Sequence, residues 1–73
     1  MKVLVITGLP SCYEDGIRVA VHKDNESEAD ICTSTCCEMN IPYRKTLRGM
    51  ISALKRDDPR CHSAKAWIEE CGL

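Results

Sequence analysis

Six cysteines and two histidines carry the most distinctive chemistry in this 73-residue chain. Cys32, Cys36 and Cys37 are close together, and Cys61 is followed directly by His62. Zinc sites usually take four ligands from two close pairs such as C-x2-C, and C-x3-C-C combined with Cys61 and His62 is not one of the recurrent patterns. We therefore interpret most of these thiols as small buried hydrophobic residues. A zinc or thiol module, or one or more disulfides, is the alternative.

Catalysis by a cysteine and a histidine would require a thiol with a lowered pKa and a histidine within hydrogen-bond distance of it. His62 adjoins Cys61, but neighbouring side chains on a helix point in different directions. His22 falls on the side of a strand that we expect to face solvent. We therefore predict that the protein is not an enzyme and that it holds no metal and no other cofactor.

The N-terminal segment KVLVITGLPS runs from an apolar stretch into a glycine-containing loop, as in many nucleotide kinases. A phosphate-binding loop would need a second glycine five residues after Gly8, followed by a lysine and a serine or threonine. Those positions hold Tyr13, Glu14 and Asp15. The phosphate-pairing lysine is therefore missing, and two carboxylates would repel the phosphates. This pattern excludes nucleotide binding of that kind.

A basic helix is the most promising binding surface. In residues 44–56, RKTLRGMISALKR, the apolar residues Leu47, Met50, Ile51 and Leu54 have the spacing of one buried helical stripe. The cations fall on the opposite side, where they could steer the protein to an acidic protein surface. Tyr43 adds an aromatic anchor. The predicted partner-binding residues are Tyr43, Arg44, Lys45, Arg48, Lys55 and Arg56.

Charge is distributed unevenly along the chain, whose net charge is −1. Residues 1–43 carry three basic and seven acidic side chains, whereas residues 44–73 carry seven basic and four acidic ones. This asymmetry is typical of a partner-binding face, and equally of two halves that neutralise each other within one domain. A nucleic-acid-binding regulator using the same helix is the rival hypothesis, although Asp57 and Asp58 and the pI of about 6.1 disfavour it.

The candidate residues must be positioned by secondary-structure elements, and the apolar patterns predict two strands at the N-terminal end. Residues 3–6 form a continuous β-branched and leucine run, which predicts a strand buried on both faces. In residues 17–22 apolar side chains alternate with Arg18, Ala20 and His22, which predicts a half-exposed strand. The glycine-rich segment 8–16 predicts a long hairpin loop between them. Residues 29–39 are ambiguous: Thr and Cys favour a strand over the first half, whereas Ser27 with Asp30 resembles a weak capping box for a helix. We predict the strand, followed by a loop or helical turn over 36–40.

Two amphipathic helices are predicted at the C-terminal end, over residues 44–56 and 61–71. The second repeats the apolar spacing with Ala64, Trp67, Ile68 and Cys71. Strands that precede helices predict an α+β fold, in which a small antiparallel β-sheet of two or three N-terminal strands is covered by two C-terminal amphipathic helices. We expect residues 1–73 to form a single domain.

The size of the chain sets further expectations. A core this small gains stability from a homodimer or a constant partner. No stretch approaches the ~18 apolar residues of a membrane span, and without a secretory signal we expect a cytoplasmic protein. The predicted function is a small non-enzymatic protein-binding module or regulator, of inhibitor or adaptor type, that contacts an acidic partner through the basic helix.

Overall fold

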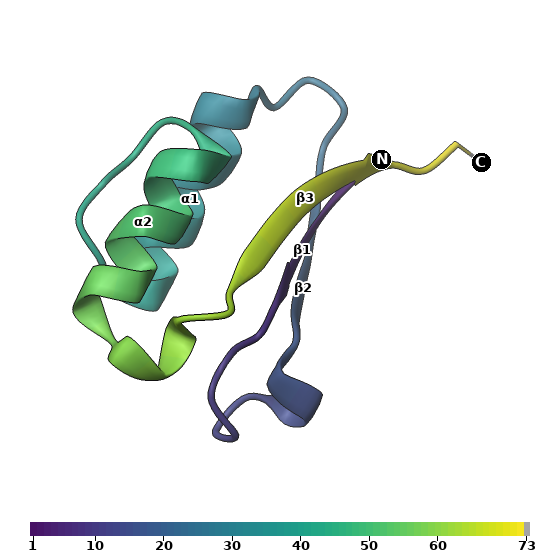
Figure 1. The fold of residues 1–73 in the computed structure, drawn as a ribbon. Helices are drawn as coiled ribbons and strands as arrows, with labels where there is room; N and C mark the ends of the chain where they lie inside the picture. Colours follow the sequence, from purple (N-terminus) through teal and green to yellow (C-terminus); the bar gives the residue numbers. More distant parts are fainter. Residues whose placement is uncertain (73) are drawn as a thin grey trace.

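The computed structural model describes residues 1–72 and has an α+β fold of two layers. A three-stranded antiparallel sheet forms one layer, and two helices packed on one of its faces form the other (Figure 1). The predicted fold class is thus confirmed. The elements in chain order are β1 (Lys2–Thr7), the 3-10 turn η1 (Glu14–Gly16), β2 (Arg18–His22), α1 (Glu28–Met39), α2 (Leu47–Asp57), the 3-10 turn η2 (Pro59–Cys61) and β3 (Lys65–Glu70).

The sheet has the strand order β2-β1-β3, with β1 in the centre and antiparallel to both neighbours. Val5 of β1 lies opposite Val19 of β2 and Trp67 of β3. The chain ends meet beside the sheet, where Met1 and Cys71 exchange backbone hydrogen bonds of 3.1 and 2.7 Å. The last strand, β3, thus lies directly beside the first strand, β1 (Figure 1).

The prediction of a helix over residues 61–71 is wrong, because this segment forms η2 and then β3. In β3, Ala66 and Ile68 face the helices, and Trp67 faces the other way. A short apolar segment of this kind satisfies both helical and strand spacing. Pairing decides between them, since β3 supplies the backbone partners for the second edge of β1. The third strand is thus C-terminal to the helices.

The preference for a strand at residues 29–39 is also wrong. Ser27 and Asp30 form a complete capping box, in which the Asp30 amide donates to the Ser27 hydroxyl at 3.1 Å and the Ser27 amide donates to the Asp30 carboxylate at 3.3 Å. Asn40 ends the helix in the left-handed conformation. Packing of one face overrides the modest helix propensity of Thr and Cys. The buried residues of α1 are Ile31, Cys32, Thr35 and Cys36.

The helix predicted over residues 44–56 is confirmed as α2, although it begins at Leu47. Thr46 is its N-cap and accepts a hydrogen bond of 3.0 Å from the Gly49 amide. Met50 and Leu54 are buried as the apolar spacing indicates, and Leu47 and Ile51 are partly buried. Because the cap is at Thr46, residues 44 and 45 lie in the preceding loop.

The core fills the space between the helices and one face of the sheet. Each layer contributes fully buried side chains, such as Leu4 and Ile6 of β1 and Met50 of α2. Gly8 lies at the end of β1 with φ +72°, and a Cβ there would overlap the Ser63 carbonyl. This glycine therefore permits the close approach of the segment that enters β3.

The orientation of β2 is opposite to the one expected. Arg18, Ala20 and His22 face the helices, whereas Val19 and Val21 face solvent. Two internal partners make this possible: the Arg18 guanidinium pairs with Glu38 of α1, and His22 Nδ1 lies 2.8 Å from Glu26 Oε2. Strand periodicity indicates that the two faces of β2 differ, and the pairing of Ala20 with Leu4 and of Arg18 with Ile6 puts its more polar face on the helix side.

Candidate functional site

The five predicted cations form a continuous feature of the helical layer, which we call the basic surface: Arg44, Lys45, Arg48, Lys55 and Arg56. All five side chains are exposed. Arg48, Lys55 and Arg56 share the side of α2 that faces away from the core, because their spacing of seven and eight residues returns them to one stripe. Arg44 and Lys45 extend it into the loop before Thr46.

None of the five cations lies within 4.0 Å of a carboxylate in residues 1–72. The guanidinium of Arg44 donates to the Tyr43 carbonyl at 2.8 Å, which leaves its charge uncompensated. Arg60 differs, since it pairs with Asp58 at 2.8 Å and thereby holds the pKa of that carboxyl below its usual range. The basic surface is thus a group of cations without internal counterions among the described residues.

The acidic side chains of the N-terminal half are used elsewhere in the fold. Glu38 pairs with Arg18, and Asp30 belongs to the cap of α1. Glu28 accepts a hydrogen bond of 3.1 Å from the Leu47 amide, which ties α1 to the first turn of α2. Glu26 accepts from the Lys23 amide and contacts His22, and these bonds hold the pKa of its carboxyl below the ordinary value. Direct contacts therefore do not neutralise the basic surface.

A shallow depression lies within the basic surface, at the junction of α2 with the preceding loop. Its volume is about 300 Å³, and it is lined by Pro42, Arg44, Ala53, Arg56 and Asp57. Two small apolar side chains are thus flanked by two guanidinium groups, while one carboxylate lies at the end of α2. Such a hollow suits a side chain that has an apolar stem and an acidic end.

Tyr43 lies next to this depression in sequence and is 64% exposed. The neighbouring Cys37 thiol at the end of α1 raises the pKa of the Tyr43 phenol. Tyrosine is neutral at physiological pH, so the exposed phenol can donate a hydrogen bond to a partner. Of the predicted partner-binding residues, Arg44 and Arg56 are brought together at this depression. Arg48 and Lys55 lie on the exposed side of α2, and Tyr43 and Lys45 are exposed in the loop before it.

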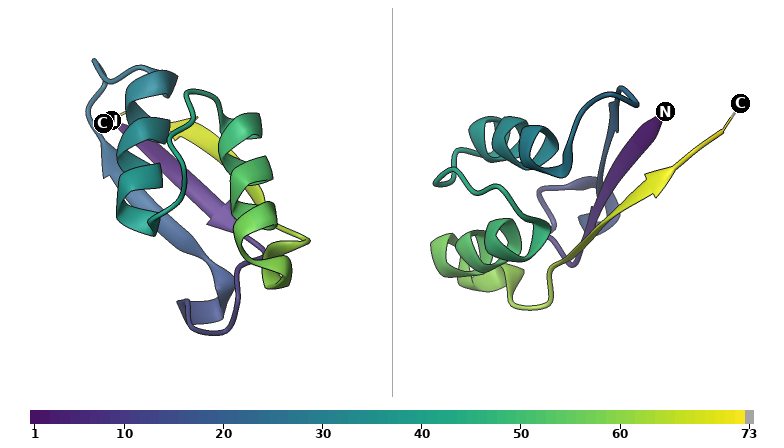
Figure 2. Two further views of the ribbon diagram at one scale, coloured as in Figure 1. Left: turned by 90° about the vertical axis from the view of Figure 1, so that its left-hand side faces the viewer. Right: turned by 90° about the horizontal axis from the view of Figure 1, so that it is seen from above.

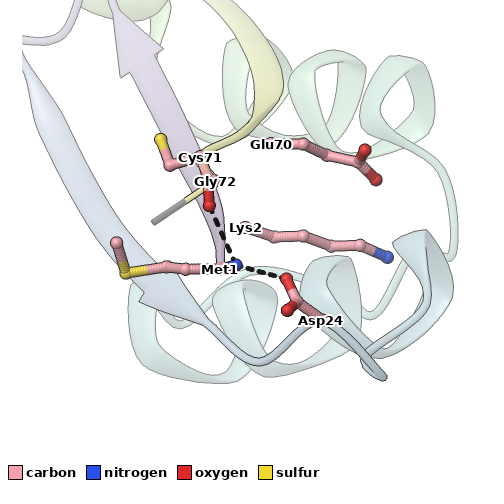
Figure 3. A pocket seen from close by; sticks show the side chains of 6 residues that line it. All are labelled: Met1, Lys2, Asp24, Glu70, Cys71 and Gly72. Atoms are coloured by element: carbon pink, nitrogen blue, oxygen red, sulfur yellow. Dashed lines mark hydrogen bonds and ion pairs between the residues drawn. The ribbon is translucent and has the colours of Figure 1, made fainter.

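A hollow of about 720 Å³ lies where Met1 meets Cys71 (Figure 3). The Met1 ammonium pairs there with Asp24 and lowers the pKa of that carboxyl. Lys2 donates to the Glu26 carbonyl at 2.7 Å. These contacts tie β1 to the segment that follows β2.

The cysteines are free thiols, and three of them are core residues. Cys32, Cys36 and Cys61 are buried, which confirms the packing interpretation for these positions. Burial raises the pKa of Cys32 to about 11 and also raises that of Cys61, so both thiols are poorer nucleophiles than an exposed cysteine. Among residues 1–72, no group of three or more His, Cys, Asp or Glu side chains is arranged to hold a metal ion.

The two histidines contact groups other than cysteine. His22 is directed at Glu26, contrary to the solvent-facing position expected of it. His62 Nδ1 lies 3.0 Å from the Ser63 hydroxyl. Neither hydrogen bond activates a thiol.

The sequence patterns did not identify a second exposed surface, the face of the sheet that the helices leave uncovered (Figure 2). Val19 and Val21 are 59% and 65% exposed there, and Trp67, predicted to lie on a buried helical stripe, is 39% exposed. The available signal was the alternation of apolar and polar residues in β2, which was assigned the wrong orientation.

Comparison of the chain with protein-family models, with curated proteins and with solved structures finds no match. Among residues 1–72, no helix combines the length and apolar character needed to cross a membrane. The interpretation of function accordingly depends on the geometry and charge of the two surfaces.

Proposed function

We propose that this chain is a small, non-enzymatic, cytoplasmic protein-binding module, a regulator of inhibitor or adaptor type, whose basic surface contacts an acidic patch on another protein. The observation that carries the proposal is the group of five exposed cations without a carboxylate within 4.0 Å in residues 1–72. A cytoplasmic location suits the chain because its thiols would stay reduced there.

Electrostatics supports an acidic partner. Like charges gathered on one helix side repel each other, and an anionic partner relieves that repulsion. Arginine contributes more than charge, because its guanidinium forms two parallel hydrogen bonds with a carboxylate. Arg44, Arg48 and Arg56 supply three such groups. Complementary charge of this kind mainly increases the association rate and the specificity of a complex.

The surroundings of the cations support a protein partner in particular. Exposed Tyr43 is the residue type enriched at the energetic centres of protein interfaces, and the adjoining depression can accept a side chain. A nucleic acid is a less suitable ligand, since the net charge is −1 and Asp57 lines the depression. A helix following α2 across a short turn could have formed a helix-turn-helix for nucleic acid, but residues 65–70 form β3 instead.

The test is affinity capture with the wild-type chain and with the double variant Arg48→Glu/Lys55→Glu. Mass spectrometry identifies the captured protein, and a direct titration with that purified protein follows. We expect the double variant to bind at least ~100-fold more weakly, because two attractive contacts become repulsive. Circular dichroism verifies that the variant remains folded.

Lys23→Glu is the matched control, since Lys23 is exposed in the loop after β2, outside the basic surface. Its binding should stay within ~3-fold of the wild type. Equal loss in both variants would contradict the proposal, and so would unchanged binding of the double variant. Capture of nucleic acid alone, with an affinity that falls steeply in rising salt, would favour the rival hypothesis.

A further inference from the structure

The sheet has one face covered by α1 and α2 and one face with no covering element (Figure 2). We call the uncovered side the open face. Its side chains come from alternate positions of each strand and from Ile17 directly before β2. They are Val3, Val5, Thr7, Ile17, Val19, Val21, Lys65, Trp67 and Glu69.

The open face is more apolar than a solvated sheet face normally is. Antiparallel sheets with one wet side usually place polar residues on that side. Here six of the nine positions are Val, Ile or Trp, and Val19 and Val21 leave more than half of their surface in solvent. The residues are contiguous because Val3 and Val5 lie between β2 and β3. A contiguous apolar patch of this kind marks an interaction surface.

We propose that the open face binds the open face of a second copy of this chain, forming a two-fold symmetric dimer that is separate from the basic surface. The occupant is inferred from the arrangement of the nine side chains. The strand register sets them in three rows across the sheet. Val21, Val3 and Glu69 form the first row, Val19, Val5 and Trp67 the second, and Thr7 and Lys65 the third. Ile17 continues the third row, because it precedes Arg18, the partner of Ile6, in an extended conformation.

A two-fold axis along the middle row makes this pattern self-complementary. The axis turns one sheet over onto the other, so the first row of each copy lies against the third row of the other. Val21 then meets Ile17, both apolar, and Glu69 meets Lys65, which have opposite charge. A symmetric interface requires such complementarity, since one patch serves both copies.

The two charges on the open face have no ion-pair partner among residues 1–72. Lys65 and Glu69 stand on either side of Trp67 in β3 and are separated by ~13 Å along the strand, too far for a pair within one chain. In the dimer each finds its counterion in the other copy, at the edge of the interface. A partner of single-sign charge would satisfy only one of them.

Trp67 is suited to burial in such an interface. Its indole N–H donates to Glu69 Oε1 at 3.0 Å, so the ring can lose its water without leaving a donor unsatisfied. The Trp67 rings of both copies lie in the middle row, close to the axis. Tryptophan near the centre of an interface is the most frequent type of energetic hot spot.

The size of the open face sets the expected affinity. Three strands of five or six residues cover on the order of 300 Å² in projection, from ~3.3 Å of rise per residue and ~4.8 Å between strands. Protruding side chains increase this, and two stacked faces bury on the order of 1,000 Å² in total, the lower limit of a specific interface. We therefore expect a reversible dimer with a Kd of ~10 µM.

Sedimentation equilibrium of the reduced, purified chain from about 5 µM to about 500 µM spans this range. The expected result is an average mass that rises with concentration, from a value between the monomer mass of 8.2 kDa and twice that mass to nearly twice that mass. Val19→Lys should raise the Kd at least ~100-fold, because the substitution occurs twice in a symmetric interface. Thr33→Lys is the matched control, since Thr33 is also β-branched and exposed but lies on α1, outside both surfaces, and it should leave the Kd unchanged.

A charge exchange tests the row arrangement itself. Lys65→Glu alone and Glu69→Lys alone each place like charges opposite one another twice, and should each raise the Kd ~10-fold. The double variant Lys65→Glu/Glu69→Lys restores opposite charges and should return to within ~3-fold of the wild type. This rescue depends on the two-fold axis, and a structural role of either residue would not produce it.

Three results would overturn the dimer. One is a monomer at every concentration, which would leave the open face to a different protein. Another is a dimer that Val19→Lys does not weaken, which would indicate pairing through the free edges of β2 or β3. The third is a dimer whose single charge variants are not rescued by the double variant. Binding through the basic surface is measured separately, so failure here leaves the proposed function standing.

Discussion

The helical layer and the open face are the two outer surfaces of one two-layer fold, and they differ in character. The exposed side of α2 carries cations and no large apolar residue, as an amphipathic surface helix should. The exposed side of the sheet carries valines and a tryptophan, whereas the strand side that faces the core includes Arg18 and His22. The difference teaches that apolar periodicity identifies the sides of an element, while tertiary partners decide which side is inward.

The two opposite faces of the sheet provide the prediction with the largest expected effect on stability. Leu4 is fully buried on the helix side of β1, so Leu4→Ala should lower the free energy of unfolding by ~3 kcal/mol, through lost burial and the cavity left behind. Val19→Thr, which keeps a β-branched side chain on the open face, should cost less than ~0.5 kcal/mol. Urea unfolding of both variants at low micromolar concentration, where a dimer is dissociated, measures the two values. Equal losses would show that the open face is part of the folded core.

The sequence predicted those elements for which local pattern and packing agree. The apolar run of β1 and the sided spacing of α2 were confirmed as a strand and a helix. The expected burial of β1 on both faces is wrong, because Val3 and Val5 are only partly buried on the open face. The capping box of Ser27 was visible, but residue propensity was given more weight than the cap. For β3 and for the orientation of β2, the deciding interactions are long-range: pairing with β1, and the contact of Arg18 with Glu38. No local pattern contains that information.

The candidate surfaces show the same difference between features set by local pattern and features set by long-range contacts. Helical periodicity alone predicts that Arg48, Lys55 and Arg56 share the exposed side of α2. Arg44 and Lys45 lie in the loop before the helix, and the binding role of all five cations stays a prediction. The open face was not predicted, because it combines residues of three strands, one of which was assigned as a helix. Trp67 is the clearest case: its spacing to Ile68 and Cys71 suggested burial, while its cross-strand neighbour Val5 places it on the open face.

The buried thiol of Cys32 in α1 gives the second test, through the pH dependence of the free energy of unfolding. Burial raises the pKa of Cys32 from 9.0 to about 11, so between these values the folded chain keeps a proton that the unfolded chain releases. The resulting contribution to stability is full below pH 9 and is lost as the pH rises through about 11. Cys32→Ala, measured by urea unfolding from pH 8 to 11, should show a shallower decline than the wild type. Parallel curves would mean that Cys32 ionises as freely as an exposed thiol.

The contact of Arg18 in β2 with Glu38 in α1 gives the third test. The side chain of Arg18 is only 17% exposed, and its Nη1 has no hydrogen-bond partner. Glu38→Ala removes its counterion and should lower the free energy of unfolding by ~1 kcal/mol, a small value because Glu38 is largely exposed. In the Arg18→Met background the same substitution should cost less than ~0.3 kcal/mol, because no buried charge is left unpaired. If Glu38→Ala lowered the free energy of unfolding equally in both backgrounds, Glu38 would not act as the counterion of Arg18.

The smallest expected effect lies on the basic surface, and its sign is informative. Arg48 and Lys55 have no counterion among residues 1–72, so Arg48→Ala/Lys55→Ala should change the free energy of unfolding by no more than ~0.5 kcal/mol. At low salt the change should be stabilising, because repulsion between cations is relieved and alanine is the best helix former. Added salt should then stabilise the wild type more than the variant, since screening already weakens the repulsion. A loss of more than ~1 kcal/mol would mean that the acidic half of the chain neutralises these cations at long range, and the charge of α2 would then serve the fold instead of a partner.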